Sequence, residues 1–134
     1  MKIKTTLTLG LAFSAALLSL PALAADVYVI ANPGLALSDE DVRDIFVGDK
    51  QIAGSTKVVP VDNASLQKDF LDKVLKLDAA KYSSIWTKKG FRDGLNAPAV
   101  KSSDAEVISA VKATPGALGY VSSAPAGVKV IKKY

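Results

Sequence analysis

The chain of 134 residues contains neither cysteine nor histidine. Without cysteine there is no disulfide framework, and no lipid can be attached through a cysteine that follows a signal peptide. The lack of both residues also removes the common nucleophile–base pairs and the usual transition-metal ligands. No spacing of carboxylates points to a catalytic pair either. We therefore expect a protein that binds no metal or cofactor and is not an enzyme.

A strong charge of one sign is also missing, since 17 Lys and Arg face 13 Asp and Glu. No basic stripe interleaved with aromatic residues appears, and nucleic acid is therefore not expected as a partner.

A long hydrophobic run is the third absence. The apolar segment 7–20 is shorter than the roughly 20 residues that span a bilayer. Lys2 and Lys4 precede this segment, and small residues follow it at 22 and 24, a pattern typical of a secretory signal peptide. We expect residues 1–24 to be cleaved, leaving 25–134 as a single periplasmic domain that is not a lipoprotein and has no stable membrane span.

Hydrophobic periodicity predicts alternating strands and helices. Strands are expected at 26–32, at 56–61, after the turn at 114–116, and at 127–133, while 91–102 reads as irregular. Helices are expected from Ser38 to Gly48, over 65–77, up to Gly90, and from Ser103, where Glu106 completes a capping box. Strands separated by helices predict an α/β fold, a sheet covered by helices on its faces.

Three of the expected helix N-termini are candidate anion sites, because each exposes unpaired N–H groups at the positive end of a helix dipole. They lie at Ser38, at 63–65 and at 102–103. Ordinary capping is the favoured interpretation at each of them, since Ser, Asp and Asn are preferred caps. The junction from Asp62 to Ser65 stands out because it follows the carboxyl end of a strand, where open α/β sheets hold ligands. It lacks the glycine that lets a backbone approach an anion closely.

Two other features could face a ligand. Tyr82 and Trp86 are spaced as helical neighbours, which is more often a core pair than a pocket wall. Arg92 could reach an anion as a bidentate donor, although a solvated charge is the simpler interpretation.

Four segments resemble, in order, the phosphate-type substrate-binding proteins of ABC transporters: "LSDEDVRDIFVG", "VVPVDNASLQKDFLDKVL", "IWTKKGF" and "SDAEVISAVKATPGALGYV". The resemblance implies a single lobe of the periplasmic-binding-protein-like (type II) fold, a mixed sheet flanked by helices. Full-length members hold phosphate between two lobes, and this chain resembles the second lobe alone.

The sequence departs from that family where phosphate is bound. The family's Arg, Asp and Ser-Gly-Thr positions hold Pro60, Asp62 and then Ala64, Ser65 and Leu66. A shift of one residue would place Ser65 on the family's Ser but would restore neither the Gly nor the Thr. Loss of several charged hydrogen bonds predicts an affinity weaker by orders of magnitude. Helix capping is thus the better-supported role of this junction.

Two functions remain open. The first is a periplasmic transport component that binds phosphate or another small anion weakly, alone or as a dimer, beside an ABC permease, with Asp62, Asn63, Ser65 and Ser38 as the candidate ligands. The alternative is an envelope sensory or protein-interaction module that keeps the lobe and has lost anion binding.

Overall fold

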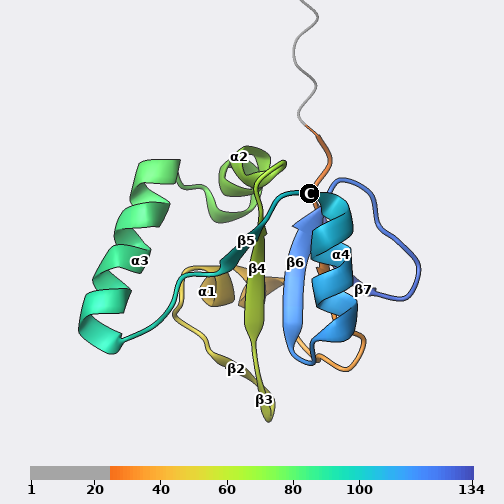
Figure 1. Cartoon of the computed structure of the whole chain (residues 1–134), viewed down its shortest axis with the longest axis horizontal. Coiled ribbons are helices and arrows are strands. Elements are labelled where there is room, and N and C mark those ends of the chain that lie inside the picture. Colours follow the sequence, from red (N-terminus) through yellow and green to blue (C-terminus); the bar gives the residue numbers. More distant parts are fainter. Residues whose placement is uncertain (1–24) are drawn as a thin grey trace, which may run out of the picture.

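The computed structural model describes residues 25–134, so the predicted signal peptide lies outside the described residues. The main sheet has five strands in the order β5-β4-β6-β1-β7 (Figure 1). β4 is parallel to β5 and β6, whereas β1 is antiparallel to β6 and β7. The strands are β1 (Tyr28–Ala31), β4 (Val59–Asn63), β5 (Ala99–Lys101), β6 (Ala117–Val121) and β7 (Lys129–Lys133). The prediction of a mixed α/β sheet is confirmed.

The helices are α1 (Asp39–Phe46), α2 (Gln67–Phe70), which continues as one π-helical turn η1 (Leu71–Leu75), α3 (Ala79–Asp93) and α4 (Asp104–Ala113). α4 runs alongside β6 on one face of the sheet, α1 lies behind the sheet, and α3 stands to one side, beyond β5 (Figure 1). The two faces of β1 follow its alternation of side chains. Val29 packs with residues of α1, α2 and η1, whereas Ile30 packs with Val107 and Val111 of α4.

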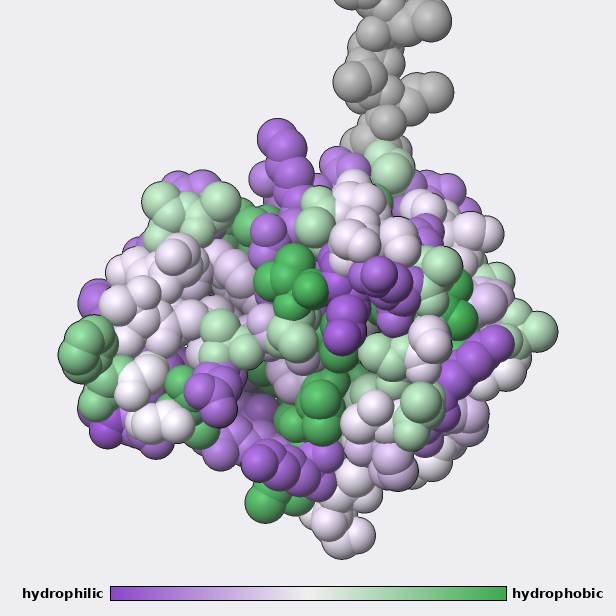
Figure 2. Space-filling model, viewed as in Figure 1, coloured by the Kyte–Doolittle hydropathy of each residue, from purple (hydrophilic) through white to green (hydrophobic). Residues whose placement is uncertain are grey.

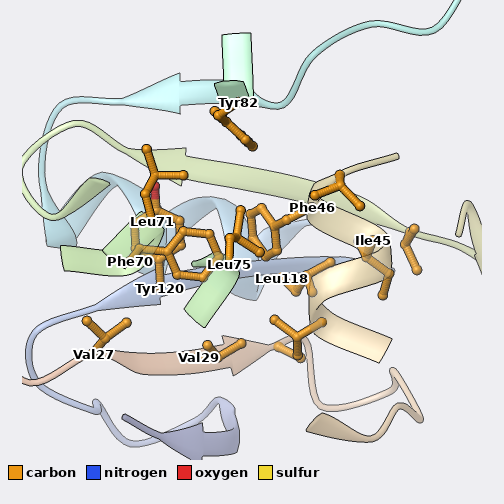
Figure 3. Packing of buried hydrophobic residues seen from close by; sticks show 14 of the residues in the cluster. Val27, Val29, Ile45, Phe46, Phe70, Leu71, Leu75, Tyr82, Leu118 and Tyr120 are labelled. Atoms are coloured by element: carbon orange, nitrogen blue, oxygen red, sulfur yellow. The ribbon is translucent and has the colours of Figure 1, made fainter. Parts of the chain in front are cut away.

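Three aromatic rings form the centre of the larger core cluster (Figure 3). The rings of Phe70 and Tyr120 are stacked, with centroids 3.8 Å apart, and Phe46 meets Phe70 edge-on at 4.7 Å. Each ring comes from a different element, so this stack joins α1, α2 and β6.

Local capping signals at two helices are confirmed. Ser38 is the N-cap of α1, its N–H donates to Asp41 Oδ2 at 3.0 Å, and Gly48 follows the helix with a φ of +79°. At α4, Ser103 is the N-cap and its Oγ accepts a hydrogen bond from the N–H of Glu106 at 3.4 Å. The expected return bond differs, because the Glu106 carboxylate accepts from the N–H of Ser102, at 2.9 Å, and not from that of Ser103.

Three predicted boundaries are wrong. The expected strand 56–61 is divided: Thr56–Lys57 forms β3, which pairs with β2 (Ile52–Ala53) in a small hairpin, and the sheet strand β4 runs further, to Asn63. α3 continues through Gly90 and ends at Gly94, whose φ of +66° supplies the left-handed cap. The segment taken as irregular contains β5, which becomes a strand through parallel pairing with β4.

Pro60 lies near the start of β4, as expected for a residue that cannot donate a ladder hydrogen bond. The N–H of Val59 donates to Gly116 on the β6 side, at 2.9 Å. Since backbone groups alternate along a strand, the nitrogen of Pro60 points to the β5 side. Pairing with β5 starts one residue later, at Val61.

Candidate functional site at the carboxyl end of β4

Asp62 occupies the centre of the candidate site and is buried, with 2% of its surface exposed. Its Oδ2 accepts a hydrogen bond from the hydroxyl of Tyr82 on α3 at 2.7 Å, and its Oδ1 accepts one from the hydroxyl of Tyr120 on β6 at 2.8 Å. Both carboxylate oxygens therefore already have a donor within the chain. Among the described residues, no salt bridge includes Asp62.

Burial dominates the electrostatics of this group. Removal from water raises the pKa of Asp62, and the hydrogen bonds from the two tyrosines oppose that rise. Burial, followed by the neighbouring Asp62 charge, also raises the pKa of Tyr82 and of Tyr120. Both hydroxyls consequently stay protonated at neutral pH and remain donors to the carboxylate.

Asn63, the last residue of β4, is fully buried and uses all of its amide groups. Its Nδ2 donates to Asp104 Oδ1 at 2.7 Å and to the carbonyl of Tyr120 at 3.0 Å. Its Oδ1 accepts from the N–H of Ser65 at 3.1 Å and from Ser65 Oγ at 2.6 Å. Asn63 thus ties the end of β4 to β6, to the start of α4 and to the following loop.

The backbone N–H groups after β4 are also engaged inside the chain. The N–H of Ala64 donates to the carbonyl of Lys101 at 2.8 Å, and the N–H of Leu66 donates to the carbonyl of Asn63 at 3.1 Å. With Ser65 N–H bonded to Asn63 Oδ1, three consecutive N–H groups point to internal acceptors. A backbone cradle for an anion needs such groups to be free.

The capping role predicted for this junction is wrong. The N-cap of α2 is Leu66, without a side-chain hydrogen bond, so the helix begins two residues after Ser65. Asp62 is part of the strand, and Asn63 closes a side-chain turn onto Ser65 before the helix starts. These two polar residues therefore order the loop and the sheet edge.

Of the four predicted ligand residues, the structure brings three together. Asp62, Asn63 and Ser65 share the end of β4, with Ser65 exposed. Ser38 is exposed at the start of α1, and no hydrogen bond within residues 25–134 links it to the other three. Arg92 is paired with its neighbour Asp93 on the surface of α3, at 3.1 Å.

A hollow of about 420 Å³ lies between α3 and the end of β4. Figure 2 shows a recess in the surface between α3 and the body of the sheet. Tyr82 and Trp86 are both buried, as a core pair would be, and both also line this hollow. Trp86 Nε1 donates to the carbonyl of Phe46 at 3.1 Å, which fixes the indole against α1.

Sequence reasoning missed the partners of the site. Tyr120 was expected as part of a strand and Asp104 as part of a helix, but both bond to the end of β4. Asp104 Oδ2 also accepts from the N–H of Ser122 at 3.0 Å, which joins α4 to the end of β6. A buried Tyr in a short apolar strand is the available signal, because its hydroxyl needs a polar partner.

Within residues 25–134, no group of His, Cys, Asp or Glu side chains is arranged to hold a metal ion. No helix of the same residues has the length and apolar character needed to cross a membrane.

Comparison with known proteins gives a structural likeness and no sequence match. No protein-family model matches the chain, and no curated protein matches it by sequence. A protein from Clostridium perfringens described as a phosphate ABC transporter substrate-binding protein, with bound phosphate, superimposes with a TM-score of 0.56 at 16% identity. The chain therefore shares the fold of part of that protein. The match covers 81% of this chain and 46% of that protein.

Two further solved structures carry the same kind of description. An ABC-type phosphate transport receptor from Vibrio cholerae has a TM-score of 0.49 at 17% identity, over 81% of this chain and 47% of the receptor. PstS from Borrelia burgdorferi has a TM-score of 0.43 at 19% identity, over 72% of this chain and 41% of PstS. The chain spans about half the length of the solved proteins that it resembles.

Proposed function

We propose that this protein is an exported, periplasmic domain of the solute-binding type that serves as a sensory or protein-interaction module of the cell envelope. In this proposal it has no catalytic activity and does not hold phosphate at the end of β4. The observation that carries the proposal is the internal use of the N–H groups of Ala64, Ser65 and Leu66 together with both oxygens of Asp62.

Two effects disfavour the binding of an anion at the end of β4. It would have to replace hydrogen bonds that already satisfy the backbone, and each unsatisfied buried group costs about 1–3 kcal/mol. It would also be repelled by the carboxylate of Asp62 when that group is ionised. Within the described residues, no arginine or lysine forms an ion pair with Asp62 that would offset this repulsion. Because one fold can carry many functions, the same lobe can instead serve as a scaffold that binds another protein.

The decisive experiment measures the thermal unfolding of the purified protein with and without millimolar inorganic phosphate. A ligand at 100 times its Kd stabilises a protein by about 2.7 kcal/mol, so binding in this range would raise Tm clearly. We expect no shift. In parallel, chemical crosslinking in the cell envelope should capture a defined partner, and the Ser65→Ala variant should capture it equally well.

Phosphate binding is the second candidate, and the fold that the chain shares with the phosphate-bound protein from Clostridium perfringens favours it. Here the protein would bind phosphate or another small anion weakly and deliver it to an ABC permease. A second copy or a separate lobe would complete the cleft. A phosphate-dependent rise in Tm that disappears in Ser65→Ala would support this function and overturn the first.

A further inference from the structure

The hollow beside α3 has the size and walls of a small-molecule site. Its volume of about 420 Å³ lies within the range of roughly 300–1,000 Å³ that is usual for ligand pockets. The sheet side supplies Asp62 and Val100, η1 supplies Leu71, and the segment before β5 supplies Ala97 and Pro98. The mouth is reachable from solvent, because Val100 keeps 59% of its surface exposed.

One face of α3 forms a wall of this hollow. Ala79, Ser83 and Thr87 follow one another at intervals of four residues, and all three are exposed while lining the hollow. Tyr82 and Trp86 occupy the adjacent stripe of the helix and form the aromatic part of the wall. Thr87 Oγ donates to the carbonyl of Ser83 at 3.0 Å, so its oxygen keeps acceptor capacity.

The hollow has an acidic residue and no basic one. Among the described residues that line it, Asp62 is the one carboxylic acid, and none is Lys or Arg. The two tyrosine hydroxyls use one acceptor position on each carboxylate oxygen, and a carboxylate offers about four such positions. A buried carboxylate without a basic partner, next to two aromatic rings, favours a cation over an anion.

We propose that the hollow between α3 and β4 binds a small organic cation, a protonated primary amine carried on an apolar body. The ammonium group would donate to Asp62 and lie against the rings of Trp86 and Tyr82. The apolar body would contact Leu71, Pro98 and Val100. This inference is independent of the envelope partner proposed above, and it assigns to the lobe a ligand of the sign opposite to phosphate.

Trp86 makes the test direct, because it is the single tryptophan of the chain and lines the hollow. The purified protein is titrated with benzylamine, phenethylamine and cyclohexylmethylamine at neutral pH, while Trp86 fluorescence is recorded. Benzyl alcohol and benzoate serve as the neutral and anionic counterparts of benzylamine. We expect saturable binding of at least one amine, roughly tenfold to a hundredfold weaker binding of its alcohol, and no binding of benzoate.

Two neighbouring serines of α3 provide a matched pair of variants. Ser83→Leu places a branched side chain in the hollow, whereas Ser84→Leu makes the same change at an exposed position outside the hollow lining. We expect Ser83→Leu to weaken amine binding at least about tenfold and Ser84→Leu to leave it unchanged. Asp62→Asn keeps the size of the side chain and removes the carboxylate. We expect it to weaken amine binding as strongly as Ser83→Leu does.

Several results would overturn the inference. They are the absence of saturable binding for all three amines, equal binding of benzylamine and benzyl alcohol, or equal effects of the two serine variants. Because Ser83 and Ser84 are exposed on the same helix, the comparison holds even if Asp62→Asn fails to fold. A rise in Tm with phosphate would contradict the proposed function. The amine titration tests the present inference separately.

Discussion

α3 and α4, the two longest helices within residues 25–134, are attached to the sheet in different ways. α4 buries Val107 and Val111 completely against β6, where Gly119 has no side chain. A Cβ atom at Gly119 would lie 2.6 Å from Val107 Cγ1, so the missing side chain is what admits the helix. α3 buries Tyr82 and Trp86, each held at its polar end by one hydrogen bond. Partly buried Ile85 and an ion pair between Lys89 and Asp49 add further contacts with the body of the protein.

This difference in packing suggests different roles for the two helices. Aliphatic packing without space between helix and sheet gives stability and leaves no room for a ligand. Two aromatic side chains that reach across a gap fix the position of a helix and keep the gap open. We therefore regard α4 as part of the core and α3 as one wall of a site.

Introducing a charge should give the largest contrast between the two helices. Val107→Asp would place an unpaired carboxylate in an apolar interface, and we expect it to destabilise the protein by more than about 4 kcal/mol. Ser83→Asp adds the same charge to the exposed inner face of α3 and should change stability by about 0.5 kcal/mol or less. Urea unfolding followed by circular dichroism measures both. Similar losses in the two variants would show that α3 is packed as tightly as α4.

A pair of glycine variants tests the same contrast with a single methyl group. Gly119→Ala should destabilise the protein by about 2 kcal/mol, because Val107 and the carbonyl of Val61 leave no space for a Cβ atom. Gly90→Ala in α3 should stabilise it by about 0.5–1 kcal/mol, since the nearest atom is an ordinary 3.5 Å away and alanine favours a helix. Unfolding free energies of opposite sign are expected, and a stabilising Gly119→Ala would refute the account of α4.

Removing the hydroxyl of Tyr82 should loosen α3, whereas removing that of Tyr120 should not. Tyr82→Phe and Tyr120→Phe each take one donor from Asp62, and we expect each to cost about 1.5 kcal/mol. Tyr82 is carried by α3 and Tyr120 by β6, so hydrogen exchange should become faster in α3 for Tyr82→Phe and stay unchanged there for Tyr120→Phe. Equal exchange in both variants would mean that the bond to Asp62 does not hold α3.

The smallest effect concerns the pH dependence of stability. Burial raises the pKa of Asp62 above its ordinary value of 3.8, so the folded chain holds this proton more tightly than the unfolded chain does. The contribution of Asp62 to stability is therefore complete below pH 3.8 and is lost as the pH rises through the raised pKa. The unfolding free energy of wild type relative to Asp62→Asn should decrease over that window. A difference that stays constant with pH would exclude a raised pKa.

The sequence predicted those features that depend on neighbouring residues. Ser38 and Gly48 bound α1, and Ser103 with Glu106 opens α4, because caps act within one helical turn. β5 was missed, since three residues become a strand only by pairing with β4. The tyrosines that bond to Asp62 lie 20 and 58 residues further along the chain, so no local pattern could reveal them. That Asp62 and Ser65 lie where a strand ends was predictable, and the hydrogen bonds that engage them inside the chain were not.

The edge of the sheet beside the hollow is bounded by two prolines. Pairing between β4 and β5 begins with Val61 opposite Ala99, and each of these residues follows a proline, Pro60 in one strand and Pro98 before the other. Neither proline has an N–H to donate, so the ladder cannot gain a further hydrogen bond from these residues. Ala97 and Pro98 stay outside the sheet and line the hollow. The same ring that ends the ladder thus supplies part of the apolar wall that a bound amine would contact.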